Sequence, residues 1–551
     1  MKRIIKIKLA GMVIALFFVS CEYLDKEFDA SLNEMQVFTD EALSRQFLNN
    51  VYSLIPTEFS GDIMFGGGIN AFFDCATDNG TQPGMHTSID LFQNSSLTPT
   101  DNPQDFWWER LFTAIRKANK YIDYADIVPV DNKEIPGDDA NRLRDRYKAE
   151  ARLLRAFYHF ELMKRWGAIP IVDKTLTMAD DLNMERKPVS EVVDYIVSEC
   201  NMVLPDLPLR YNDPANAGRV SGAMAMALKS RALLYAASPL FNTENDLSKW
   251  DEAALAAKQL MDKNAFSLYN NYEELFTTMH NNEIIFSCHP QNNRSVETHN
   301  SPTGYTDCVG YSNPSQNLVD AYEMNNGLPI SDPGSGYDPQ NPYSNRDPRF
   351  EQTILHNGSE WFYREVETFE GGIDRSSNIT TKTGYYVRKW LNPNVYTTNN
   401  TFVNQYHMWI HFRYGEILLN YAEAQNEAAG PDASVYSAIN AIRTRPTVNM
   451  PPLPDGLSKE EMRERIHNER RIELAFESHW YYDVRRWKMG NQYLNIPLRG
   501  VRINKDGENL TYTYEEVEQR LFLDKNYLYP IPFEEWIKAP DLGQNPGYEI
   551  E

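Results

Sequence analysis

Cysteines and long hydrophobic runs are both scarce in this sequence. Five cysteines among 551 residues are too few for a disulfide scaffold, and no pair has the C-x-x-C spacing of a zinc or redox motif. Beyond the N-terminus, no apolar run approaches the length of about 18 to 20 residues that crosses a bilayer. These absences exclude disulfide-rich miniproteins and multispanning helical membrane proteins.

Basic residues are also under-represented. The chain has 54 Lys and Arg against 77 Asp and Glu, a formal net charge of −23. Such an acidic surface argues against binding to nucleic acids or to an anionic membrane face, and it suits neutral ligands such as sugars, or cationic ones. Aromatic residues are instead abundant, at 12% of the chain. That is enough for a large core and for aromatic side chains on the surface.

The first 20 residues are typical of a lipoprotein signal peptide. Basic residues near the start precede the apolar segment 9–19, which has the length of a secretory h-region. The segment ends in "FVSC", so Cys21 follows it directly, which suits diacylglyceryl transfer to the thiol and cleavage before it. An ordinary signal peptide cleaved nearby is the alternative. Removing residues 1–20, with four positive groups and no acids, changes the charge from −23 to −27 and leaves a chain anchored by its lipid.

The remaining cysteines are Cys75, Cys200, Cys288 and Cys308. An exported protein can pair four cysteines in three ways, and a bond between Cys288 and Cys308 would close a loop in the middle of the chain. Buried free thiols are the other alternative.

Most of the chain shows helical periodicity, in pairs of segments joined by short loops. The segments are 33–55, 105–126, 142–167, 190–204, 221–237, 248–262, 413–430 and 433–446. Antiparallel helix pairs are the unit of tetratricopeptide-type solenoids, although no strict 34-residue repeat can be marked. We therefore predict a mainly α fold in which tetratricopeptide-like helix pairs form a solenoid scaffold.

The region 265–410 departs from this pattern. It is rich in Asn, Pro, Gly, Ser, Thr and Tyr and contains short strand-like runs such as "EIIFSC" and "MWIHFR". We predict an irregular, loop-rich lobe here, between an N-terminal helical region at 21–264 and a C-terminal helical region and tail at 411–551. An early glycine-rich stretch at 61–100 is the other long non-helical insertion.

The segment "NERRIELAFESHWYYDVRRW" at 468–487 is dense in charge but neutral overall, so it does not form a phosphate-binding groove. With no Gly or Pro from 463 to 489, it is predicted to be one helix, along which Glu469, Glu473 and Glu477 form an acidic stripe. Like charges at this spacing repel, so we expect arginines to face them, with Arg152 and Arg155 as candidates. No catalytic motif is present, and the predicted role is to lock two layers together.

Several motifs together resemble the SusD/RagB family. After the lipobox and "CEYLDKEF", they are "AEARLLRAFYHFELMKRWGAIPIV" at 149–172, "GRVSGAMAMALKSRALLYAASPLF" at 218–241, "NRDPRF" at 345–350, "RYGEILLNYAEAQNE" at 413–427, "AINAIRTRP" at 438–446, the segment 468–487 and the tail "LYPIPFEEW…GQNPGY". The resemblance spans nearly the whole mature chain. It implies a surface-exposed, lipid-anchored outer-membrane protein without enzymatic activity or cofactor, which binds a nutrient and docks as a lid on a SusC-like TonB-dependent transporter.

Candidate ligand-binding residues come from the two insertions, because loops on a rigid frame usually carry binding residues. Sugars are held by flat aromatic faces and by planar polar side chains. The candidates are Phe73, Asp78 and Asn79 in the early loop, Asn292, Arg294, Tyr305 and Tyr311 in the loop 289–313, and Trp361. We expect the two insertions to meet and to form one ligand face. The EF-hand spacing is absent from the acidic loop near 332–347, and no metal site is predicted.

The sequence therefore predicts a non-catalytic lipoprotein that delivers an oligosaccharide or polysaccharide to its transporter. A peptide ligand, as for RagB-like members, is the nearest alternative. A glycoside hydrolase, which needs two carboxylates across a cleft, and a helical-repeat adaptor without a small ligand are the rivals from other classes.

Overall fold

The computed structural model describes residues 33–57, 71–84, 86–130, 140–211, 213, 216–288, 292–377, 379–396 and 401–549. The predicted signal peptide and Cys21 lie outside these residues. None of the described helices is both long enough and apolar enough to cross a bilayer. Cys75, Cys200, Cys288 and Cys308 are all thiols, so neither Cys288 nor Cys308 takes part in the disulfide considered above.

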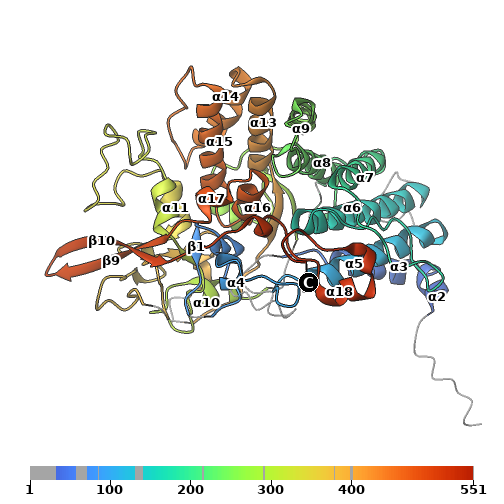
Figure 1. Cartoon of the computed structure of the whole chain (residues 1–551), viewed down its shortest axis with the longest axis horizontal. Coiled ribbons are helices and arrows are strands. Elements are labelled where there is room, and N and C mark those ends of the chain that lie inside the picture. Colours follow the sequence, from blue (N-terminus) through green and yellow to red (C-terminus); the bar gives the residue numbers. More distant parts are fainter. Residues whose placement is uncertain are drawn as a thin grey trace, which may run out of the picture.

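A stack of helices forms the scaffold (Figure 1). Its members are α2 (Glu34–Phe38), α3 (Glu41–Tyr52), α5 (Phe106–Tyr124), α6 (Ala140–Trp166), α7 (Val189–Val203), α8 (Gly222–Ala237), α9 (Leu247–Met261), α13 (Tyr414–Ala429), α14 (Ala433–Arg443), α15 (Lys459–Glu473) and α16 (His479–Arg486). Each helix from α5 to α9 packs on the next in sequence, and α9 then packs on α13. This order confirms the predicted mainly α, tetratricopeptide-like architecture.

Local chemistry explains where these helices begin and how closely they pack. The side chain of Ser458 accepts a hydrogen bond from the Glu461 N–H, and the Glu461 side chain accepts one from Ser458 in return, which starts α15 with a capping box. Ser221 caps α8 in a similar way by accepting from Met224. The alanines of α8 are buried, and their small side chains let α8 lie close to α7 and α9.

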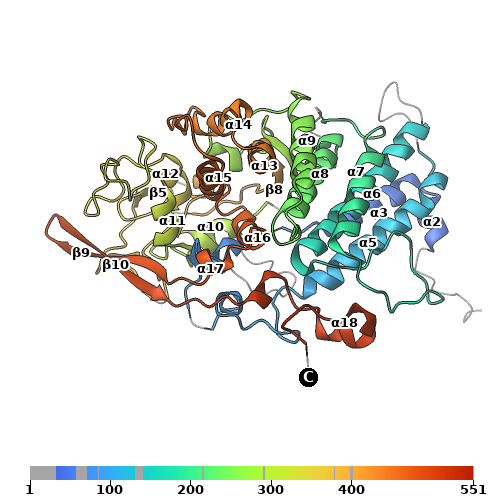
Figure 2. The same ribbon diagram turned by 45° about the horizontal axis from the view of Figure 1, so that its top comes forward.

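The irregular lobe is an insertion between α9 and α13. It holds the short helices α10 (Ser295–Asn300), α11 (Gln316–Ala321) and α12 (Arg349–Thr353), and the strands β2 (Ile284–Cys288), β3 (Asn313–Pro314), β4 (Ile354–Leu355), β5 (Glu360–Trp361), β6 (Arg364–Glu365), β7 (Tyr386–Val387) and β8 (Trp409–Arg413). Strand β2 pairs antiparallel with β8. The chain therefore leaves the scaffold on one strand of this ribbon and returns on the other, directly into α13 (Figure 2).

The two insertions meet, as the sequence predicted. Strand β1 (Gly80–Thr81) of the early insertion pairs antiparallel with β3 of the lobe. The Phe72 N–H donates a 2.9 Å hydrogen bond to Oγ of Ser312, and the Ser315 N–H donates one of the same length to the Asn79 carbonyl. The early loop is thus fixed to the lobe by backbone pairing.

The C-terminal region adds a hairpin that the sequence analysis did not predict. Strands β9 (Leu498–Asp506) and β10 (Asn509–Glu518) form an antiparallel ribbon that projects from the lobe end of the molecule (Figure 1). The tail then crosses back to the helices, where the indole N–H of Trp166 donates a 2.9 Å hydrogen bond to the Pro530 carbonyl. It ends beyond α18 (Phe533–Lys538), so the tail lies as a strap over the scaffold.

The segment 468–487 is not one helix, contrary to the prediction. Helix α15 ends at Glu473 and α16 begins at His479, and Phe476 and Ser478 between them have φ values of 58° and 61°. The N–H groups of Phe476 and Ser478 donate hydrogen bonds of 3.0 and 3.1 Å to the two carboxylate oxygens of Asp74. A side chain of the early insertion therefore stabilises a break between two helices, although the segment itself contains no Gly or Pro that would predict one.

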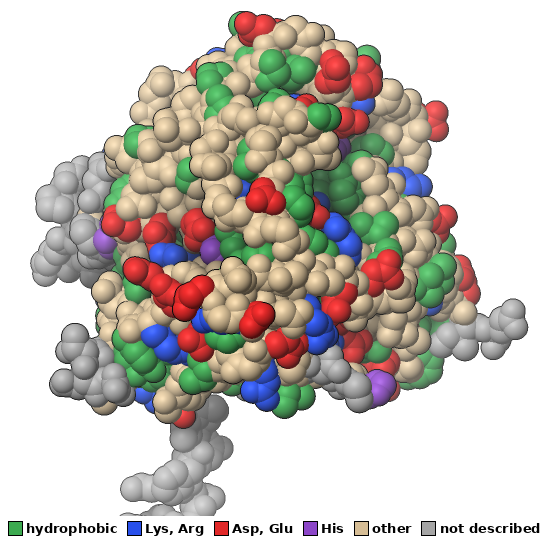
Figure 3. Space-filling view, turned by 90° about the vertical axis from the view of Figure 1, so that its left-hand side faces the viewer, with side chains coloured by type: hydrophobic (Ala, Val, Ile, Leu, Met, Phe, Trp, Pro, Cys, Tyr) green, Lys and Arg blue, Asp and Glu red, His purple; other side chains and the backbone are tan. Residues whose placement is uncertain are grey.

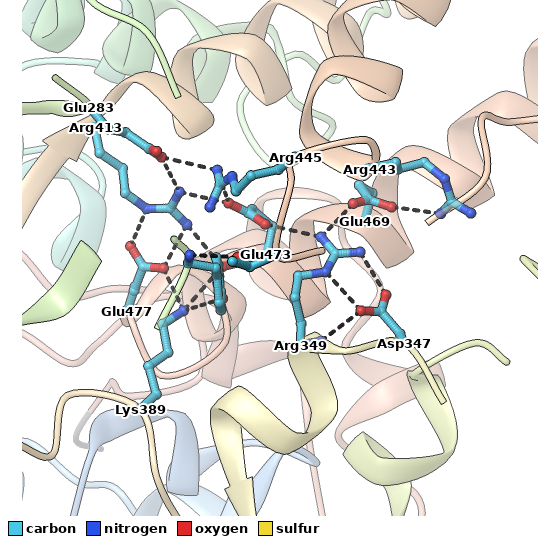
Figure 4. A network of polar contacts seen from close by, with 12 residues as sticks. Glu283, Asp347, Arg349, Lys389, Arg413, Arg443, Arg445, Glu469, Glu473 and Glu477 are labelled. Atoms are coloured by element: carbon cyan, nitrogen blue, oxygen red, sulfur yellow. Dashed lines mark hydrogen bonds and ion pairs between the residues drawn. The ribbon is translucent and has the colours of Figure 1, made fainter. Parts of the chain in front are cut away.

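The acidic stripe is buried, as predicted, but the expected arginines are not its partners. Arg152 and Arg155 lie 3.0 and 2.7 Å from Glu199 of α7 instead. All but one of the partners come from segments that carry the family resemblance, and Figure 4 shows the network that they form. They are Arg349 from "NRDPRF", Arg413 from "RYGE", Arg443 and Arg445 from "AIRTRP", and Lys389.

Glu473 is the centre of this network. Its carboxylate lies 2.8 Å from Arg413, 2.9 Å from Arg445 and 3.0 Å from Arg349. Burial alone would raise the pKa of Glu473, but the three guanidinium groups outweigh it and hold that pKa far below its ordinary value. Four of the motifs that carry the family resemblance, at 345–350, 413–427, 438–446 and 468–487, therefore meet in one buried ionic network that joins the lobe to the helices α13–α15.

Candidate ligand-binding site

Three predicted site residues in the early insertion are buried beneath the surface. Phe73 packs against Tyr481, with ring centroids 4.4 Å apart. Asp78 lies 2.6 Å from Arg471 and accepts a 2.7 Å hydrogen bond from the Trp480 indole N–H. In this arrangement their polar atoms and ring faces are engaged by the protein itself.

Asn79 is held in the same way. Its amide donates to Asp74 at 3.0 Å, and its carbonyl oxygen accepts from Nε of Arg471 at 2.8 Å. The early insertion, over the residues that the structure describes, thus supports the lobe from below and brings Asp78 and Asn79 to α15 instead of to solvent.

Tyr305 and Trp361 come together at the base of an aromatic cluster. Both are nearly buried, with 2% and 3% of their surface exposed. The Tyr305 hydroxyl donates a 2.6 Å hydrogen bond to the Trp361 carbonyl, and the Trp361 indole N–H donates one of 3.2 Å to Oγ of Ser301. Burial raises the pKa of Tyr305 above its usual range, so this hydroxyl stays protonated and donates at any physiological pH.

More exposed rings lie above this base. The cluster comprises Phe362, Tyr363, Tyr396 and Phe402, with Tyr305 and Trp361 beneath them. The rings of Tyr363 and Tyr396 have centroids 5.0 Å apart, and those of Phe362 and Tyr396 are stacked at the same distance. Phe402 lies 5.1 Å from Tyr396. Tyr363 is 55% exposed, so a flat aromatic face reaches solvent here. We call these six residues the aromatic cluster.

The aromatic cluster is presented by a strained hairpin turn. Strands β5 and β6 pair Trp361 with Arg364, which leaves Phe362 and Tyr363 as the two turn residues. Phe362 has φ = 50°, a left-handed conformation that such turns usually reserve for Gly, Asn or Asp. Arg364 stabilises the turn, because its guanidinium lies 2.6 Å from the buried carboxylate of Asp374 and 4.0 Å from the Tyr305 ring centroid. Backbone strain of this kind concentrates at functional sites.

The remaining predicted residues lie at the edge of the cluster or beside it. Arg294 is exposed, and its guanidinium is 5.4 Å from the Phe402 ring. Asn292 is exposed near it in sequence, and Tyr311 is half-buried with its ring 5.6 Å from His299. The structure therefore brings Arg294, Tyr305 and Trp361 to one place, whereas Phe73, Asp78 and Asn79 belong to the support below.

Sequence reasoning missed Tyr363, Tyr396 and Phe402. The run of three aromatic residues in "SEWFYRE" gave a partial signal, because successive strand residues point to opposite faces and the three rings cannot all face the core; alternation alone does not identify Tyr363 as the exposed ring. Tyr396 and Phe402 gave no comparable signal. Their nearness depends on an isolated bridge between them.

The surface at the lobe end mixes charges of both signs. Figure 3 shows acidic and basic side chains interspersed with hydrophobic ones over this face. Among the described residues, no three His, Cys, Asp or Glu side chains gather in an arrangement that could hold a metal ion. An aromatic face can stack on a ring-shaped ligand, and an arginine at its edge can donate hydrogen bonds to the oxygens of that ligand.

Comparison with known proteins agrees with this architecture. The model of the SusD family matches residues 277–548, and a model described as starch-binding and associating with the outer membrane matches residues 22–234. A SusD-like protein of Formosa agariphila is 24% identical over 549 residues, which cover 96% of each chain. The chain belongs to the SusD/RagB family.

Solved structures give the same result. The crystal structure of a SusD-like protein from Bacteroides fragilis superposes with a TM-score of 0.79 at 27% identity, over 94% of this chain and 99% of that one. A SusD-like carbohydrate-binding protein from the same species has a TM-score of 0.76 at 24% identity, over 92% of this chain and 99% of that one. The fold, including the lobe, is therefore that of SusD-like proteins.

Proposed function

We propose that this protein is a non-catalytic, lipid-anchored binding protein of the outer membrane that captures an oligosaccharide or polysaccharide on the aromatic cluster. The observation that carries the proposal is the exposed face of Tyr363, held over Tyr305 and Trp361 by a turn with Phe362 in a left-handed conformation. A sugar ring presents C–H groups that pack on such faces, and Arg294 at the edge can donate to its hydroxyls.

The descriptions of relatives support a glycan as the ligand. One matching family model is described as starch-binding, and one similar structure is that of a carbohydrate-binding protein. Membership of the SusD/RagB family further supports delivery of the glycan to a SusC-like TonB-dependent transporter, with the protein anchored through a lipid on Cys21 and facing the outside of the cell.

The ligand-binding face in this proposal includes Arg294, Tyr305 and Trp361 from the sequence analysis and adds the exposed rings. Asn292, two residues before Arg294, and Tyr311 are the remaining candidates for contact with a longer glycan. Phe73, Asp78 and Asn79 position the lobe and contribute indirectly.

Binding of the purified mature protein to a panel of neutral and acidic polysaccharides tests the proposal. We expect retention on at least one glycan in affinity electrophoresis, loss of it in Tyr363→Ala, and no loss in the control Tyr124→Ala, which removes a tyrosine stacked on Phe38 in the helical scaffold. Binding to a peptide library but to no glycan would favour the RagB-like alternative. Release of reducing sugar from a bound glycan would instead identify a hydrolase.

A further inference from the structure

A hollow is lined by described residues of the loop between α7 and α8, by strand β2 and by the residues just before that strand. It has a volume of about 230 Å³, against roughly 30 Å³ for a water molecule in the liquid. Its walls include Met279, Ile284 and Phe286 as an apolar floor, with Arg210, Asn216 and His280 among the polar groups around it. The hollow is thus large enough for a single sugar-sized ring, and its lining contains both apolar and polar side chains.

Arg210 gives this hollow a charge that the protein does not neutralise. Its Nη1 and Nη2 donate hydrogen bonds of 3.0 and 3.1 Å to the carbonyl oxygens of Ala265 and Asn281. Both acceptors are uncharged. Over the described ranges of the chain, no carboxylate lies within the 4.0 Å of an ion pair with Arg210. The guanidinium is therefore held rigidly in the wall while its positive charge remains available.

Two further charged residues that the structure describes, Arg219 and Asp213, line the hollow, and neither forms an ion pair with Arg210. Arg219 lines it and is paired with buried Glu150 at 2.6 Å. Ser221 lines it as well and is the N-cap of α8, so the positive end of that helix dipole is directed here. Asp213 is the acidic residue of the lining. Since Glu150 neutralises Arg219 and the Asp213 side chain is exposed to solvent, Arg210 and the N-terminus of α8 are the groups that favour an anion here.

We propose that this hollow binds a sugar-sized anion, a uronate or a sulfated monosaccharide. The anionic group would accept charge-assisted hydrogen bonds from Arg210, and the ring would lie on the apolar floor. The site is built from segments other than those of the aromatic cluster, so the inference does not rest on the proposed function. If both this proposal and the proposed function hold, the protein binds its glycan at the aromatic cluster and also binds an acidic sugar residue of that glycan in this hollow.

Isothermal titration of the mature protein with three probes tests this. The probes are galacturonate, galactose 6-sulfate and galactose. We expect at least one anion to bind at least tenfold more tightly than galactose, with an affinity that falls as salt is raised. Binding of that anion should weaken at least tenfold in Arg210→Gln. It should stay within twofold in Lys505→Gln, which removes one positive charge from the exposed hairpin.

Three results would overturn the proposal: no binding of either anion, equal binding of anion and galactose, or an unchanged affinity in Arg210→Gln. Because Arg210 also anchors two carbonyl groups, that variant is checked by its melting temperature. If it is unstable, His280→Ala and a crystal structure of the wild-type protein with the anion decide, and a ligand outside the hollow refutes the assignment. Tyr363→Ala should weaken polysaccharide retention but not monosaccharide binding, which separates this site from the aromatic cluster.

Discussion

Nη2 of Arg471 lies 2.6 Å from Oδ2 of Asp78, although 393 residues separate them in sequence. Both side chains are buried. The contact fastens the early insertion to helix α15, and the Trp480 indole N–H holds the other oxygen of the same carboxylate from α16 at 2.7 Å. Asp78 therefore fixes the position of the lobe's support, although its place in a loop first indicated a ligand contact.

Asp78→Ala should consequently lower stability and leave ligand affinity unchanged in the folded protein. The substitution leaves the Arg471 charge buried without its partner, which costs about 3 to 5 kcal/mol in comparable cases. Urea unfolding measures the first effect, and glycan titration below the unfolding transition measures the second. Glu244→Ala, in the exposed loop between α8 and α9, is the control and should change neither. A lost affinity with unchanged unfolding would show that Asp78 contacts the ligand after all.

Glu473→Ala should be among the most destabilising single changes in the chain. Three arginines converge on this buried carboxylate, and its removal leaves their charges unbalanced, at a cost of about 3 to 5 kcal/mol. Chemical denaturation followed by circular dichroism measures the difference in unfolding free energy between the variant and the wild-type protein. Glu464→Ala on the exposed side of the same helix serves as the control, with an expected change within about 0.5 kcal/mol. An unchanged melting temperature for Glu473→Ala would contradict the assigned role.

Periodicity allowed the acidic stripe to be predicted, but not its partners. Spacing of four residues places Glu469 and Glu473 on one face whichever helix they occupy, so their burial against arginines could be predicted. Which arginines pair with them depends on the path of the lobe, because Arg349 is brought in by α12 within the lobe and Arg413 by strand β8 at its end. The break after α15 depends on Asp74, about 400 positions earlier in the chain.

The candidate site, like the acidic stripe, could be predicted from the sequence only in part. Composition located the lobe and brought Arg294, Tyr305 and Trp361 into the prediction. It could not separate an inward ring from an outward one, because that depends on hairpin register. Trp361 lies in a strand and is buried, whereas Tyr363 lies in the turn two residues later and is exposed. Local pattern therefore identified loops that contribute to the aromatic cluster, and tertiary register decided which rings reach solvent.

Acid should weaken the fold through buried carboxylates such as that of Glu423, which lies 2.5 Å from Arg486 in a second ionic cluster. Burial alone would raise the pKa of Glu423, but Arg486 and Arg470 outweigh it and lower that pKa from 4.5 to about 2. A carboxyl group whose pKa is lower in the folded than in the unfolded protein stabilises the fold at pH values above its unfolded-state pKa. This contribution, up to about 3 kcal/mol for one group, is lost as the pH falls from about 4.5 to about 2. Unfolding free energies from pH 7 to 3 should fall less steeply in Glu423→Gln. Parallel profiles for the two proteins would contradict this.

Lipidation at Cys21 is tested independently of the fold. Because the apolar segment ends directly before this residue, Cys21→Ala should abolish lipid attachment and leave the protein unprocessed or released from the membrane fraction. Membrane fractionation and mass spectrometry of the mature N-terminus measure this. Cys75→Ser, at a buried cysteine of the described fold, is the control and should remain lipidated. An unmodified mature N-terminus elsewhere would establish ordinary signal cleavage.

Tyr363→Ala and Tyr305→Phe should separate contact from support in the aromatic cluster. Tyr363 offers its exposed ring to the ligand, so its removal should weaken glycan affinity at least tenfold, about 1.4 kcal/mol, with an unchanged melting temperature. Tyr305→Phe keeps the buried ring but loses the hydrogen bond to the Trp361 carbonyl, which should cost about 1 kcal/mol of stability and a smaller loss of affinity. Titration and thermal unfolding of both variants give the comparison. If Tyr305→Phe weakens binding more than Tyr363→Ala does, the ligand approaches from below the turn, and the exposed face of Tyr363 is not its platform.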